Sequence, residues 1–138
     1  MKRFSIVMAG LLSAAAALGD DVTGSETLLC SASRIVACYE EGDCAELIAE
    51  EVGVPQFVVI DTRDGKVSTT RASGENRSTP IGEVNRADGL MFFQGIEQSR
   101  AFSFVIHEQS GHLTVAVSRD GVSVTVFGSC TDATDADL

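Results

Sequence analysis

The stretch from Gly89 to Cys130 constrains the fold of this chain more than any other part of it. Its apolar residues fall into four segments that are separated by very short polar turns. We expect these segments to be β-strands, at Leu90–Ile96, Arg100–His107, His112–Ser118 and Gly121–Ser129. In the last three, apolar and polar residues alternate, which is the period of two expected of strands with one buried face. The sequence therefore predicts a β-meander.

Short turns fix the predicted register of this meander. We place them at Gln98–Ser99, around Ser110 and at Asp120–Gly121, the last as a two-residue type I′ turn. The facing pairs that follow are Phe93 with Phe104, Ile106 with Leu113, Phe104 with Val115, Val117 with Val124, and Val115 with Val126. These side chains all share one face of the sheet, and a shift of one residue would scatter them.

Two glycines of the meander lie opposite large side chains in this register. Gly95 faces Phe102, and Gly128 faces Leu113. A glycine inside a strand often marks a place where a large neighbour or a second backbone approaches closely. We therefore expect tight packing or a sharp bend at both positions.

The part of the chain before the meander predicts four more strands and one short helix. The strands are Thr27–Tyr39, Gln56–Thr62, Lys66–Arg71 and Pro80–Arg86. The helix covers Asp43–Glu51, because Asp43 is a suitable N-cap, Gly53 follows the helix end and Pro55 prevents its continuation.

Eight strands that are linked almost entirely by hairpins imply an all-β fold. We expect an eight-stranded antiparallel up-and-down barrel with one short helix after the first strand, and a two-sheet β-sandwich is the alternative. Residues 20–138 then form a single domain with a frayed acidic tail at residues 131–138.

A barrel of eight strands has a narrow interior, which side chains fill or which holds one small ligand. The predicted inward side chains are large: Val84, Met91, Phe93, Phe102, Phe104 and Ile106. We expect them to fill the interior. If the interior is hollow instead, its cavity should be lined by Phe93, Phe102 and Phe104 and should hold a small apolar molecule, as in a lipocalin-like carrier.

Residues 1–19 have the features of a secretory signal peptide. Lys2 and Arg3 precede an apolar run from Phe4 to Leu18, and small residues stand at Ala17 and Gly19. The run is short for a membrane-spanning helix, which needs about 20 apolar residues. The sequence therefore predicts an exported protein, periplasmic or secreted, with no membrane insertion after removal of the signal.

The exported part is strongly acidic. Residues 20–138 carry eight basic and twenty acidic side chains, which gives a net charge of −12. Nucleic acids and anionic membranes need a basic surface, so neither is an expected partner. The charge permits a basic protein partner, although acidity can also serve only to keep an exported protein soluble.

Four cysteines in the exported part predict two disulfides, as is typical of small secreted domains. We expect Cys30–Cys130, because the first and last strands of an up-and-down barrel are neighbours. The second pair, Cys38–Cys44, then closes a short local loop. The spacings do not suit a zinc site.

The sequence offers few groups for catalysis. His107 and His112 face each other across a predicted hairpin with Glu108 beside them, but two imidazoles are few ligands for a metal ion, so we expect no metal and no cofactor. There is no Gly-x-Ser-x-Gly motif, no helical His-x-x-x-His and no cysteine outside the two pairs. We therefore expect a protein that is not an enzyme.

The signal peptide, the hairpin-linked strands and the terminal cysteine in Val126-Phe127-Gly128-Ser129-Cys130 resemble small periplasmic proteins of Gram-negative bacteria. The architecture is similar to that of the periplasmic inhibitors of c-type lysozyme, which are eight-stranded barrels. The resemblance implies a barrel that binds a protein, and it implies no site residues.

We therefore expect a non-enzymatic, disulfide-bonded binding protein whose partner is a protein. The acidic charge favours a basic partner, such as a hydrolase that it inhibits. The loops Glu40–Asp43 and Ser73–Ser78 are the expected contacts. A carrier of a small apolar ligand and a structural protein of the cell envelope are the alternatives.

Overall fold

The computed structural model describes residues 19–138, so the predicted signal peptide lies outside the described residues except for Gly19. Residues 19–138 form one antiparallel sheet of ten strands in the order β5-β4-β3-β1-β10-β9-β8-β7-β6, with β2 paired to β1. The strands are β1 (Thr27–Tyr39), β2 (Cys44–Leu47), β3 (Phe57–Asp61), β4 (Lys66–Thr69), β5 (Ser78–Pro80), β6 (Asn85–Ala87), β7 (Leu90–Glu97), β8 (Arg100–His107), β9 (His112–Arg119) and β10 (Val122–Asp132). A short helix, α1 (Ala49–Val52), and a 3₁₀ turn, η1 (Arg71–Ser73), complete the elements.

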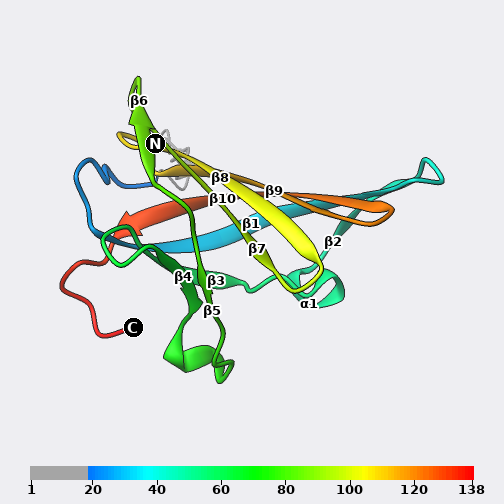
Figure 1. Ribbon diagram of the computed structural model, residues 1–138, viewed down its shortest axis with the longest axis horizontal. Helices are drawn as coiled ribbons and strands as arrows, with labels where there is room; N and C mark the ends of the chain where they lie inside the picture. Colours follow the sequence, from blue (N-terminus) through cyan, green and yellow to red (C-terminus); the bar gives the residue numbers. More distant parts are fainter. Residues whose placement is uncertain (1–18) are drawn as a thin grey trace, which may run out of the picture.

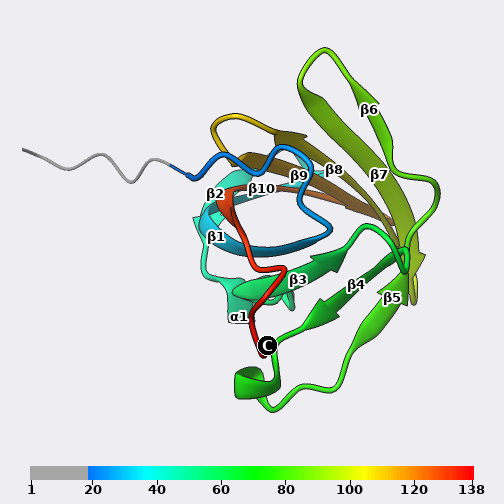
Figure 2. The same cartoon turned by 90° about the vertical axis from the view of Figure 1, so that its left-hand side faces the viewer.

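The sheet curls into a half-barrel, which confirms the predicted all-β, up-and-down fold (Figures 1 and 2). Its two edges meet at one point. Ile81, which follows β5, forms an isolated bridge with Gly95 on β7, and the Gly82 N–H donates to the Gln94 carbonyl oxygen at 2.9 Å. The contact between these two edges of the half-barrel thus depends on a few backbone hydrogen bonds.

The predicted register of the meander is confirmed at each of its turns. Phe93 pairs with Phe104, Phe104 with Val115, Ile106 with Leu113, Val117 with Val124, and Val115 with Val126. The turn at Asp120–Gly121 has the predicted length but not the predicted type. A type I′ turn needs a positive φ at both central residues, and only Gly121 has one (69°).

Both glycines of the meander lie where another part of the chain approaches closely. A Cβ at Gly95 would stand 2.5 Å from Cζ of Phe102 and 3.0 Å from the Pro80 carbonyl oxygen. A Cβ at Gly128 would stand only 2.0 Å from the carbonyl oxygen of Ser31 on β1. The predicted Gly95–Phe102 and Gly128–Leu113 pairings are present.

The predicted strand Pro80–Arg86 is wrong. The chain instead forms β5, which ends at Pro80, and β6, which begins at Asn85. Between them it crosses from one edge of the half-barrel to the other, because the N–H of Ile81 bonds to Gly65 while that of Gly82 bonds to Gln94. The pairing with the β4 side thus ends at Ile81, one residue beyond Pro80.

The predicted helix Asp43–Glu51 is largely wrong. Residues Cys44–Leu47 form β2, since the Cys38–Cys44 disulfide folds the chain back onto β1. The helix is confined to α1, where Ile48 rather than Asp43 is the N-cap. Its predicted end is confirmed, because Gly53 adopts the left-handed conformation (φ 63°) that favours glycine.

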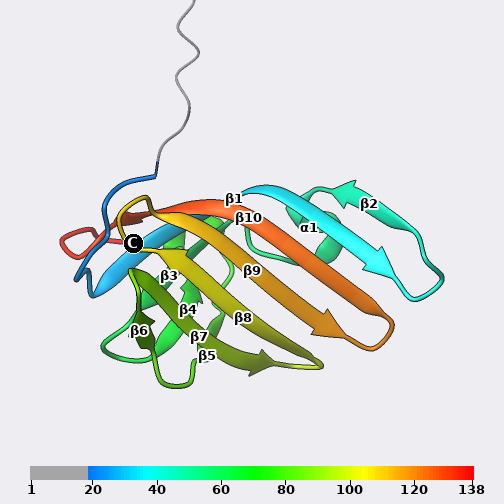
Figure 3. The same cartoon turned by 90° about the horizontal axis from the view of Figure 1, so that it is seen from above.

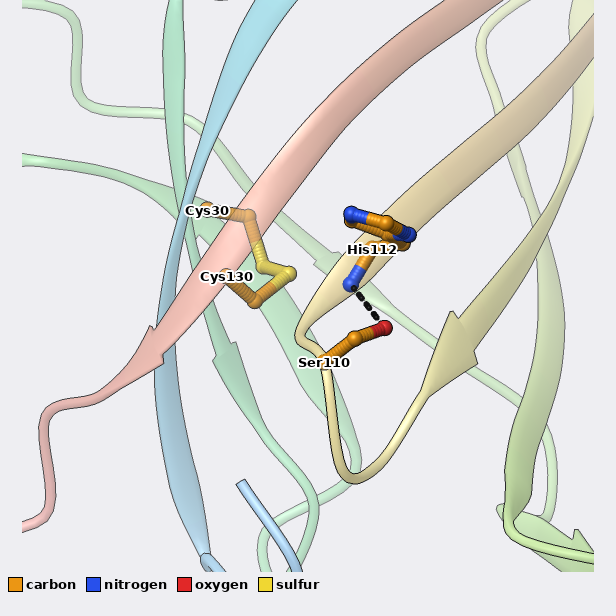
Figure 4. Close-up of a disulfide and its surroundings, with 4 residues drawn as sticks. All are labelled: Cys30, Ser110, His112 and Cys130. Carbon is orange, nitrogen blue, oxygen red and sulfur yellow. Dashed lines mark hydrogen bonds between the residues drawn. A yellow bond between two sulfur atoms is a disulfide. The ribbon is translucent and has the colours of Figure 1, made fainter. Parts of the chain in front are cut away.

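Both predicted disulfides are present. Cys30–Cys130 joins β1 to β10, at positions that face each other with their Cα atoms 4.0 Å apart (Figure 4). The first and last strands are therefore neighbours, as expected. The two edges of the half-barrel, which meet between β5 and β7, are joined by hydrogen bonds and not by a disulfide.

One end of the half-barrel is densely packed. Leu28, Ile60, Met91 and Ile106 are fully buried there, together with Val22 from the segment before β1. The C-terminus contributes as well: β10 extends to Asp132 and Ala133 is buried, so residues 131–133 belong to the fold and not to a frayed tail.

Candidate ligand-binding pocket

The other end of the half-barrel is hollow. A cavity of about 90 Å³ lies there, open to solvent on one side and bordered by the ends of β7 and β8, by β3 and β4, and by the linker that follows α1. Its walls are mostly apolar, and they include Val58, Val67, Phe102, Phe104, Val115 and Val117. The prediction that side chains fill the interior is therefore wrong at this end.

A mismatch in side-chain size explains the cavity. The meander contributes Phe102 and Phe104 to one wall, whereas the opposite wall is built from Val58, Val67 and the small Ala32 beside the bulge in β1. Protein interiors are normally packed without voids larger than a water molecule. A solvent-accessible cavity of this size is larger than the gaps of ordinary packing.

The three predicted cavity phenylalanines form one aromatic cluster. Phe93 stacks on Phe104 with ring centroids 4.7 Å apart, and Phe102 meets Phe104 edge to face at 5.5 Å. Phe102 and Phe104 line the cavity. Phe93 is buried, stacks on Phe104 and is not among the lining residues.

Four polar side chains stand at the mouth of the cavity and form what we call the mouth cluster: Arg77, Thr79, Glu97 and Arg100. Glu97 is its centre. Its carboxylate accepts two hydrogen bonds from Arg77, at 3.2 Å from Nε and 2.7 Å from Nη2. It also accepts the Thr79 hydroxyl at 3.2 Å and lies 3.4 Å from Nη2 of Arg100.

The cluster shifts the titration of its members. The hydrogen bonds from Arg77 lower the pKa of Glu97 below its ordinary value of 4.5. The positive charges of Arg77 and Arg100 lower this pKa further, whereas partial burial of the carboxyl group raises it. Hydrogen bonding to Glu97 raises the pKa of Arg77 in turn. Glu97 and Arg77 are therefore both charged at neutral pH.

Glu97 should contribute to stability in a pH-dependent way. A carboxyl group whose pKa is lower in the folded than in the unfolded chain stabilises the fold above the unfolded-state pKa, and this stabilisation is lost as the pH falls through the folded-state pKa. We expect Glu97→Gln to lower the free energy of unfolding by about 2 kcal/mol at pH 7 and to have a progressively smaller effect as the pH falls below the ordinary pKa of 4.5. Urea unfolding at several pH values measures this.

The control for this prediction is Glu46→Gln. Glu46 also contacts an arginine, Arg34, at 2.9 Å, but both side chains are more than half exposed. Such a pair contributes little to stability. An equal loss in the two variants, or a loss in Glu97→Gln that does not shrink in acid, would contradict the role given to Glu97.

Sequence reasoning missed the mouth cluster. Glu97 and Arg100 continue the inward-facing alternation of their strands beyond Gly95 and Phe102, so charged residues at inward positions were the available signal. Arg77 lies in the predicted contact loop Ser73–Ser78, but nothing in its local sequence indicates that it faces a cavity.

The candidate metal ligands are not brought into a metal-binding arrangement. His107 and His112 are both exposed, and no group of three or more potential ligands occurs within residues 19–138. Glu108 is buried and forms an ion pair with Arg86, which also donates to the Ser25 carbonyl oxygen. At the start of β9, the His112 backbone N–H donates to Ser110 Oγ at 3.4 Å (Figure 4).

The second predicted contact loop, Glu40–Asp43, lies at the tip of the β1–β2 hairpin. This hairpin extends beyond the rest of the sheet, as Figure 3 shows. The Cys38–Cys44 disulfide closes the loop at its base, and its acidic side chains are exposed.

Comparisons of the chain with protein-family models, with curated proteins and with solved structures found no match. Within residues 19–138, none of the helices has the length and apolar character required to cross a membrane.

Proposed function

We propose that this protein binds a small apolar or amphiphilic molecule in the cavity of its half-barrel, outside the cytoplasm. The cavity is the observation that supports this proposal. An apolar concavity with a few polar groups at its entrance is the usual form of a small-molecule site, and the two disulfides fit an oxidising compartment.

The volume of the cavity limits the size of the buried group. An engineered cavity of about 150 Å³ with apolar walls binds benzene, which has six carbon atoms. In proportion, the 90 Å³ cavity accommodates about three or four carbon atoms. The rest of any larger ligand must lie at the mouth.

The walls are held in place before a ligand arrives. Cys30, which is joined covalently to Cys130, lies among the lining residues, and the core behind Phe104 is packed. A site that is already formed avoids much of the entropic cost of ordering on binding.

A pair of neighbouring valines provides the test. Val58 on β3 lines the cavity, whereas Val59 lies outside it. Butan-1-ol, added to the folded protein, should shift the NMR signals of the Val58, Val67 and Val117 methyl groups. Val58→Phe should fill the cavity and abolish these shifts, and Val59→Phe should retain them. Unchanged lining signals at millimolar butan-1-ol in the wild type would remove the proposal.

A second candidate function is the binding of a cationic protein, such as a basic hydrolase that is thereby inhibited. The loop Glu40–Asp43 supports this candidate, because the loop is acidic, projects from the half-barrel and is closed at its base by a disulfide. Opposite charges accelerate encounter between proteins. Passage over immobilised lysozyme at physiological salt should retain the wild type and release the variant in which Glu40, Glu41 and Asp43 are changed to their amides; no retention would exclude this partner.

A further inference from the structure

We propose that the ligand of the cavity is a short-chain carboxylate, whose alkyl group enters the cavity and whose carboxylate binds Arg100 at the mouth. This inference rests on the proposed function, because it assigns a ligand class to the same cavity. It comes from the charges and the hydrogen-bond donors of the mouth cluster.

The charges that line the cavity do not balance. Arg77 and Glu97 form a close, two-point pair, and such a pair is neutral. Arg100 remains, with only 17% of its side chain exposed. Glu75 offsets part of the charge of Arg77, at 3.2 Å, but it is half exposed and does not line the cavity. The lining therefore carries one positive charge in excess, in a protein that is otherwise strongly acidic.

Arg100 also has donors to spare. A guanidinium group carries five N–H donors. Within residues 19–138, Nη1 donates to the Gly53 carbonyl oxygen at 3.2 Å, and Nη2 lies 3.4 Å from a Glu97 oxygen that already accepts from Arg77. The other donors are free to bind a carboxylate, for which the planar guanidinium group has a matching geometry.

These two features define the ligand together. The apolar walls take an alkyl group of about three or four carbon atoms, and the positive charge belongs to the mouth cluster, which contains all the charged side chains of the lining. A carboxylic acid of four or five carbon atoms, linear or branched, fits both requirements. A long fatty acid does not, because its chain would have to leave the cavity again.

Arg100 has a structural role that any test must separate from ligand binding. Its bond to Gly53 links β8 to the end of α1, so a substitution can disturb the linker that borders the cavity. A purely structural residue would affect neutral and charged ligands alike. The comparison of an acid with the alcohol of the same length therefore distinguishes the two roles.

The first experiment compares pentanoate with pentan-1-ol on the disulfide-bonded wild type, with dissociation constants measured from methyl NMR shifts. We expect pentanoate to bind at least about tenfold more tightly, as for a hydrogen bond between charged groups. From ethanoate to pentanoate the affinity should rise about fourfold for each methylene group and then level off. Equal binding of the acid and the alcohol, or a rise that continues to decanoate, would overturn the inference.

The second experiment changes the arginine. Arg100→Gln should weaken pentanoate about tenfold and leave pentan-1-ol within twofold. Arg119→Gln removes the same charge from the exposed end of β9 and should change neither affinity. Equal weakening of both ligands by Arg100→Gln would show that Arg100 only supports the fold. If this variant does not fold, the preference of the wild type for acid over alcohol decides the matter.

The outcomes also separate this inference from the proposed function. Binding of pentan-1-ol without a preference for pentanoate keeps the cavity as a binding site and removes the carboxylate. Failure of both ligands to shift the signals of the lining residues removes both proposals.

Discussion

Removal of the Cys30–Cys130 disulfide, by changing both cysteines to alanine, is expected to lower the free energy of unfolding by about 4–5 kcal/mol. The bond joins residues that are 100 positions apart, and closing so long a loop greatly reduces the conformational entropy of the unfolded chain. Both cysteines are also buried, so the substitution leaves unfilled volume between β1 and β10. Urea unfolding of the oxidised wild type and the variant measures the loss.

The second disulfide is the matched control. Cys38 and Cys44 are only 6 positions apart, and on the same chain-entropy argument their replacement by alanine should cost about 2 kcal/mol. Equal losses, or a larger loss for the short loop, would show that loop closure does not account for the stability of this protein.

Gly128→Ala is expected to lower the free energy of unfolding by about 3 kcal/mol or more. The added Cβ would lie 2.0 Å from the Ser31 carbonyl oxygen and 3.0 Å from its carbonyl carbon. These are backbone atoms, so no rotation of a side chain relieves the contact. The β1–β10 ladder has to open just before its bulge between Ala32 and Arg34.

Gly82→Ala is the control for this substitution. A Cβ at Gly82 would have the Gln94 carbonyl oxygen as its nearest neighbour, at 3.6 Å, an ordinary van der Waals distance. We expect a change within about 0.5 kcal/mol, measured as the thermal unfolding midpoint and by urea. Similar stabilities of the Gly128→Ala and Gly82→Ala proteins would contradict the close contact between β1 and β10.

The meander was predictable because its signals are local. Alternation of apolar residues fixes which side of a strand is buried, and short turns fix the register, so pairs such as Phe104–Val115 follow from the sequence without knowledge of the rest of the fold. The Cys30–Cys130 bond was predictable for a related reason, since an up-and-down barrel makes its first and last strands neighbours.

The errors occur where tertiary contacts override local preference. Residues Cys44–Leu47 belong to a segment with helical signals, yet pairing with β1 and the Cys38–Cys44 bond hold them as a strand. Pro80–Arg86 has the apolar pattern of a strand, but its backbone crosses between two edges of the sheet.

The cavity was beyond prediction by alternation alone. Alternation indicates that Val58 and Phe102 both face inward, but it does not say that they stand on opposite walls or that their combined size leaves a gap. The same holds for Arg77, which reaches Glu97 from a loop 20 residues away in the sequence. Such features arise only when distant segments are placed in three dimensions.

The most direct test of a ligand-binding cavity is a crystal structure of the protein under xenon pressure. Xenon binds in empty apolar cavities of proteins and needs no knowledge of the natural ligand. We expect xenon density among Val58, Val67 and Phe102, in the space that the cavity occupies. A structure without xenon at this position, in which Phe102 or a neighbouring side chain fills the space, would contradict a binding function for the half-barrel.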